Sequence, residues 1–102
     1  MQPKITEQSQ GIYAIEGELN MQTVPGVSRQ LLKLLPMAEG EKFTLDLAAV
    51  TRSDSAGVAL LVEVMQQAKI AKLTLLFSNL PQQMQDIAGI SGLLDILPVS
   101  QN

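Results

Sequence analysis

Residues 45–65 read LDLAAVTRSDSAGVALLVEVM, and the rest of the chain is organised around this stretch. Leu45 and Leu47 alternate with polar residues, which is the spacing of a β-strand. A short polar turn at residues 51–55 follows, and an apolar helix then opens with small residues. Ser55 is thereby presented at a helix N-terminus, where unpaired N–H groups and the positive dipole end favour an oxyanion or phosphate.

The flanking segments predict a mixed α/β fold. Residues 4–8 and 11–17 have the pattern of a hairpin turning at Gln10-Gly11, and Thr23 is a candidate N-cap for a first helix that residues 36–41 end. The other expected elements are strands at 43–47 and 73–77, helices at 55–70 and from Pro81 to a stop at Gly89, and a helical turn at 93–97. Strand 73–77 is continuously apolar, so we expect a central strand covered on both faces. The strand–helix–strand order from 43 to 77 implies a right-handed parallel crossover. We predict one domain, residues 1–102, with a small mixed β-sheet and helices mainly on one face.

Composition excludes several classes of function. The chain is 46% hydrophobic and 17% charged, enough to bury a core. One Tyr and two Phe disfavour stacking on single-stranded nucleic acid, and a net charge of −3 without a basic run disfavours a phosphate-backbone partner. The absence of Cys and His excludes thiol nucleophiles, Cys/His metal sites and a Ser-His-Asp triad. We expect no enzyme, no metal and no cofactor.

The sequence also bears on location. Residues 1–10 lack the apolar core of a signal peptide. The longest apolar run, around residues 58–62, is far shorter than the ~20 residues that span a membrane. We therefore expect a soluble cytoplasmic protein without direct membrane insertion.

At ~100° per residue, helix 55–70 separates into three faces. The expected core face holds Gly57, Leu60, Leu61, Val64, Met65 and Ala68, opposite Glu63, Gln66, Gln67 and Lys69. A stripe of Ser55, Ala59, Val62 and Gln66 lies on the flank of the exposed side. This stripe is either a flat docking surface or a combination of surface alanine and core-edge valine, both of which are ordinary.

Ser55 itself has competing interpretations. It is a cap or first-turn residue in the simplest one. A nucleophile elbow would need glycine at position 53, where serine stands, and no His base exists. As a phosphate acceptor, Ser55 has a favourable helix terminus but an adjacent Asp54 that would repel the charge. Asp46, Asp54 and Glu63 do not form an acid–base pair in the predicted arrangement.

The stretch 45–64 resembles the signature of the STAS domain family, which is shared by sulphate transporters and anti-sigma-factor antagonists. Leu-Asp-Leu at 45–47, Asp-Ser-Ala-Gly at 54–57 and Gly-Glu-Leu at 17–19 carry the resemblance. Ser-Asn-Leu-Pro at 78–81 and Leu-Asp-Ile-Leu-Pro at 94–98 are similar to the MlaB-like subgroup. The chain departs from the family pattern at Ala48 and at Ala56, where many phosphorylated antagonists carry a second Ser.

The resemblance implies a non-enzymatic subunit of a phospholipid-transporting ABC complex that maintains outer-membrane lipid asymmetry. Its partner would be an ATPase subunit of the MlaF type, in a complex with permease and lipid-binding subunits at the inner face of the inner membrane. The candidate docking surface comprises Arg52, Asp54, Ser55, Ala59, Val62, Glu63 and Gln66. The alternative is an anti-sigma-factor antagonist switched by phosphorylation of Ser55. No residue supports a third class, an enzyme or small-ligand carrier.

Overall fold

A computed structural model of the protein describes residues 2–38 and 41–100. Its sheet begins with β1 (Lys4–Ser9) and β2 (Ile12–Leu19), an antiparallel hairpin that turns at the predicted Gln10-Gly11. Gly11 has a φ of +79°, which few other residues adopt easily. β3 (Lys42–Asp46) pairs parallel to β2, and β5 (Thr74–Ser78) pairs parallel to β3. The sheet is therefore mixed, as the sequence predicts.

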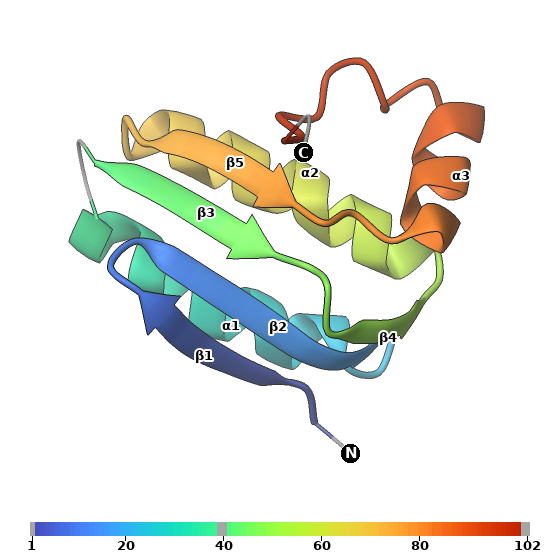
Figure 1. The fold of residues 1–102 in the computed structure, drawn as a ribbon, viewed down its shortest axis with the longest axis horizontal. Helices are drawn as coiled ribbons and strands as arrows, with labels where there is room; N and C mark the ends of the chain where they lie inside the picture. Colours follow the sequence, from blue (N-terminus) through green and yellow to red (C-terminus); the bar gives the residue numbers. More distant parts are fainter. Residues whose placement is uncertain (1, 39–40, 101–102) are drawn as a thin grey trace.

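Two long helices cover one face of this sheet, which lies in front of them in Figure 1, and a third helix lies beyond the strand ends. The helical elements are α1 (Val24–Leu34), the 3-10 turn η1 (Leu35–Ala38), α2 (Ser55–Ile70) and α3 (Gln82–Ile90). α2 contacts both α1 and α3. The fully buried core side chains between the layers include Ile15, Leu31, Phe43, Leu45, Leu61, Val64, Phe77 and Met84. The one-sided α/β arrangement is confirmed.

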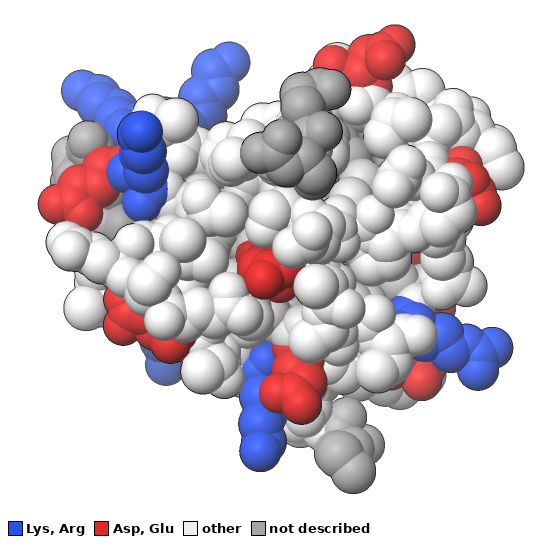
Figure 2. Space-filling view, viewed as in Figure 1, with Lys and Arg blue, Asp and Glu red and all other residues white. Residues whose placement is uncertain are grey.

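The other sheet face carries no helix among the described residues. Figure 2 shows this face as largely uncharged, with Lys, Arg, Asp and Glu mainly around its rim. The prediction that strand 73–77 is central and covered on both faces is wrong. β5 ends the strand order β1-β2-β3-β5, and Leu76 is 38% exposed beside the fully buried Phe77. An apolar run does not specify how many faces a strand buries, because that depends on where the helices pack.

A further strand occupies part of the predicted turn. β4 (Val50–Ser53) pairs parallel to residues 17–19 of β2, beyond the part of β2 that pairs with β3. Only its two terminal residues, Val50 and Ser53, are buried, so the segment lacks the apolar alternation that marks a strand. The eight residues of β2 are long enough to pair first with β3 and then with β4.

Two helix boundaries differ from expectation in their chemistry. Thr23 occupies the N-cap position of α1, but its hydroxyl makes no cap bond and instead donates to the Glu18 carbonyl oxygen at 2.8 Å. Gly89 lies inside α3 and does not stop it. Gly92, at a φ of +73°, ends the helix instead, and the Leu93 N–H donates to the Ala88 carbonyl at 2.8 Å. The helical turn at 93–97 is present, closed by the Leu97 N–H on the Leu93 carbonyl at 3.2 Å.

Among the described residues, no helix has both the length and the hydropathy needed for a membrane crossing.

Candidate functional site

The site is the turn where β4 enters α2. The Asp54 N–H donates to the Leu19 carbonyl at 3.2 Å, which fixes the turn to the end of β2. The Asp54 side chain then accepts the Ala56 N–H at 2.8 Å and caps the helix. Asp54 is thus the N-cap, and Ser55 is the first residue of α2. Of the two structural interpretations of Ser55, the first-turn one is correct.

Gly57 permits a very close approach between α2 and β4. A Cβ atom on Gly57 would lie 2.0 Å from the Ser53 Oγ and 3.1 Å from the Leu19 Cβ. Ser53 is only 3% exposed, and its Oγ donates to the Asp54 carbonyl oxygen at 3.0 Å. The glycine at position 57 is therefore a packing requirement of this turn.

The structure distributes the candidate docking surface along the outer side of α2. Ser55, Ala59, Glu63 and Gln66 are exposed, and Arg52 and Asp54 are exposed just before the helix. Val62 is half-buried and packs against the core, as its core-edge interpretation requires. Met65, which was expected on the core face, is also only half-buried. Val58 was not expected there, but it is buried in the core.

Three of the candidate residues meet around one depression. Arg52, Asp54 and Ser55 line a hollow of about 450 Å³ together with residues from β2 and α3. The other lining residues are Glu18, Leu19, Asn20, Ser53, Gln83 and Ile87. Gln83 contacts the turn through its side chain, because its Oε1 accepts the Ser53 N–H at 2.8 Å.

Ala59 and Glu63 face a second hollow, the α1–α2 groove, of about 370 Å³. Its other lining residues are Met21, Val24, Pro25, Ser28, Ala56 and Leu60. The Ser28 hydroxyl donates to the Glu63 carboxylate across the two helices. Met21 is 76% exposed, an unusual position for a large apolar side chain. The sequence prediction missed this α1 side, although a methionine within the polar turn at 20–23 was an available signal.

Each of the three carboxylates that the sequence singled out, Asp46, Asp54 and Glu63, accepts its own hydrogen bond. Asp46 lies at the end of β3, where the Asn79 amide donates to its Oδ1 at 2.9 Å and the Ala48 N–H donates at 3.0 Å. The hydrogen bond from Asn79 lowers the pKa of Asp46 against the opposing effect of partial burial, and the Ala48 N–H lowers it further. Within residues 2–38 and 41–100, no group of three or more carboxylates is placed to hold a metal ion.

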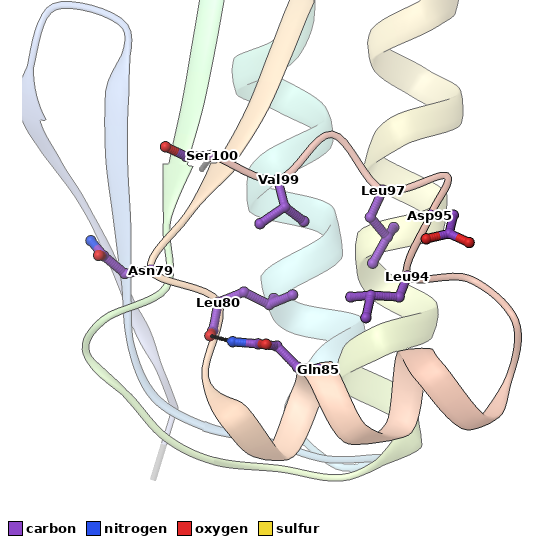
Figure 3. Close-up of a pocket in the computed structure, with 8 residues that line it drawn as sticks. All are labelled: Asn79, Leu80, Gln85, Leu94, Asp95, Leu97, Val99 and Ser100. Carbon is purple, nitrogen blue, oxygen red and sulfur yellow. Dashed lines mark hydrogen bonds between the residues drawn. The ribbon is translucent and has the colours of Figure 1, made fainter. Parts of the chain in front are cut away.

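A further hollow lies on another part of the molecule. It measures about 600 Å³ between the β5–α3 connection and the C-terminal segment, and Figure 3 shows Leu80, Leu94, Leu97 and Val99 converging on it. The Gln85 amide there donates to the Leu80 carbonyl oxygen at 2.8 Å. The Asn79 amide is already engaged by Asp46. The side-chain amides of Asn79 and Gln85 in this hollow therefore bond within the fold.

Comparison with known proteins gives the following matches. A family model described as "Mlab, STAS domain" matches residues 4–98. The anti-sigma factor antagonist SpoIIAA in its unphosphorylated form, also solved phosphorylated as a Bacillus cell fate determinant, is 15% identical with a TM-score of 0.72, covering 98% of this chain and 89% of that one.

Two further structures are similar. An anti-sigma-factor antagonist (STAS) domain protein from Planctomyces limnophilus is 15% identical with a TM-score of 0.72, covering 97% of this chain and 89% of its own. A variant of RsbS from Moorella thermoacetica is 18% identical with a TM-score of 0.73, covering 98% of this chain and 86% of that one. At these identities the structures establish a shared fold.

Proposed function

Because the chain belongs to the STAS domain family, we propose that it is a non-enzymatic subunit that binds and supports the ATPase of a phospholipid-transporting ABC complex. Domains of this family generally act in regulation and protein interaction. The MlaB-like family model favours the transporter role over other roles of the fold. In this role the protein associates with the inner face of the inner membrane through its partner, and the complex maintains outer-membrane lipid asymmetry.

The observation that carries the proposal is the outer side of α2. Ser55, Ala59 and Gln66 are exposed and uncharged along it, and the carboxylate of the exposed Glu63 between them accepts the Ser28 hydroxyl. Uncharged side chains let a partner approach without desolvating an ion, and Ser55 and Ala59 are also small enough for a partner backbone to come close. The α1–α2 groove continues this surface sideways with exposed Met21 and with Pro25. We call the exposed line of Ser55, Ala59 and Gln66 the crest of α2. A helix crest of this kind beside an apolar groove has the form of a protein-binding surface.

The test is co-purification of this protein with the ATPase subunit from the same genome. Ala59→Arg places a long charged side chain on the crest at an exposed position, so the fold is expected to be unaffected. We expect binding to weaken by ~2 kcal/mol or more, the loss typical of a central interface position. Thr6→Arg on β1 is the matched control, because it adds the same side chain at an exposed position away from α2.

The expected result is loss of the complex for Ala59→Arg alone, with both variants showing the thermal stability of the parent. Equal binding by the two variants would show that the crest of α2 is not the interface. Absence of any complex with the parent protein would reject the ATPase as partner.

A second candidate function has one observation in its favour. Ser55 is exposed at the first position of α2, and its hydroxyl has no hydrogen-bond partner among the residues described. This leaves it accessible to a kinase, as an anti-sigma-factor antagonist switched by phosphorylation would require. Intact-mass measurement on protein from its native cell under several growth states tests this candidate. A constant unmodified mass would exclude the switch.

A further inference from the structure

β4 has one edge paired with β2 and the other facing α3. The Asp54 N–H, directly after the strand, is used by Leu19 of β2, whereas the Ser53 N–H points to the other side. An edge strand presents unpaired N–H and C=O groups, and a buried one must find a partner. That partner is the side-chain amide of Gln83, whose Oε1 lies 2.8 Å from the Ser53 nitrogen.

Movement of Ser53 would be transmitted directly to the turn where β4 enters α2. Its Oγ donates to the Asp54 carbonyl oxygen, and the same Oγ fills the space that a side chain on Gly57 would need. The Asp54 carbonyl also accepts the Gly57 N–H at 3.1 Å, and the Asp54 side chain caps α2. Asp54 and Ser55 are thus held between Leu19 on one side and the Ser53–Gln83 bond on the other.

Gln83 is itself an exposed residue of α3 and lies outside the candidate docking surface. Its Oε1 approaches the turn from the α3 side of the depression that Arg52, Asp54 and Ser55 line. Its neighbour Gln82, also exposed, uses its amide differently and donates to Asp86 one turn later in α3 at 2.8 Å. The two adjacent glutamines therefore differ in what they hold: Gln82 makes a hydrogen bond within α3, and Gln83 makes one between α3 and β4.

We propose that Gln83 is a positioning residue for partner binding, because its amide oxygen holds the Asp54–Ser55 turn in the geometry that the partner meets. The inference rests on the proposed docking function. It assigns to α3 a part in recognition that does not depend on contact with the partner. Only the acceptor oxygen matters in this role, so a glutamate at the position is expected to serve as well.

The experiment compares Gln83→Leu, which removes the acceptor, with Gln83→Glu, which keeps one, and with Gln82→Leu as the matched control. The first readout is amide hydrogen exchange of Ser53 in the isolated protein, followed by NMR. We expect roughly tenfold faster exchange in Gln83→Leu, the loss of one partly buried hydrogen bond, and parent-like exchange in the other two variants.

The second readout is the dissociation constant for the ATPase subunit. We expect Gln83→Leu to bind roughly tenfold more weakly, with Gln83→Glu and Gln82→Leu close to the parent. Unchanged Ser53 exchange in Gln83→Leu would overturn the inference without any partner present. Faster exchange with unchanged binding would overturn the positioning role while leaving the docking function standing. A parent protein that does not bind the ATPase would overturn the docking function and, with it, the role of Gln83.

Discussion

Gly57 shows how one residue connects the helix to the strand before it. Replacing it with Ala adds a Cβ 2.0 Å from the Ser53 Oγ and 3.1 Å from the Leu19 Cβ, so the turn must open or Ser53 must lose its bond to Asp54. This cost exceeds the ~1 kcal/mol by which Ala is favoured over Gly in a helix. We expect Gly57→Ala to lower the free energy of unfolding by about 1–3 kcal/mol in urea denaturation.

Gly89 supplies the matched control, because it lies in α3 with no atom within 4 Å of an added Cβ. Gly89→Ala is expected to raise the free energy of unfolding by about 0.5–1 kcal/mol. If the two variants were equally stable, close packing at position 57 would not be the reason for its glycine.

Asp46 makes the stability of the β3–β4 connection depend on pH. Its pKa is lowered in the folded protein, chiefly by the Asn79 amide, so the ionised form stabilises the fold above the ordinary Asp value of 3.8. That contribution is lost as the pH falls through the lower folded pKa.

Asp46→Asn keeps an acceptor oxygen but no charge, and we expect it to cost on the order of 0.5 kcal/mol at neutral pH, since the site is partly open to solvent. Urea denaturation of both proteins as the pH is lowered from neutrality to below the ordinary Asp value of 3.8 checks this. The difference in the free energy of unfolding between parent and variant should narrow below that value, and a constant difference would contradict the assignment.

At the scale of elements, local pattern determined the helices better than the strands. The predicted bounds of the second helix, 55–70, coincide with those of α2, because its cap, its small residues and its apolar faces are all encoded within one segment. β4 was missed and β5 was placed at the centre, because both depend on neighbours distant in sequence. The α1 side of the groove was missed for the same reason, since only packing brings Met21 and Ser28 beside α2.

The uncovered face of β5 has a measurable consequence. Phe77 is fully buried under the helices, whereas Leu76 is 38% exposed on the open face. Phe77→Ala is therefore expected to cost about 3–5 kcal/mol, and Leu76→Ala less than about 1 kcal/mol. Thermal unfolding of the two variants distinguishes them. A large loss at Leu76 would mean that both faces of β5 are covered in solution.

At the scale of the whole molecule, binding and stability should respond differently to one added charge. The protein carries a net charge of −3, and Glu18 and Asp54 line the depression beside Ser55. Ser55→Glu changes the net charge from −3 to −4. The positive end of α2 attracts the new carboxylate and Asp54 repels it, so we expect the free energy of unfolding to change by less than about 0.5 kcal/mol.

Ser9→Glu, at an exposed position on β1, makes the same charge change away from α2. On the docking surface, a partner must desolvate the larger charged side chain of Ser55→Glu when it binds. We therefore expect Ser55→Glu to bind the ATPase at least about tenfold more weakly in calorimetric titration, and Ser9→Glu to bind like the parent. Parent-like affinity in both variants would place Ser55 outside the interface, and equal weakening in both would mean that net charge alone, rather than the surface of α2, governs association.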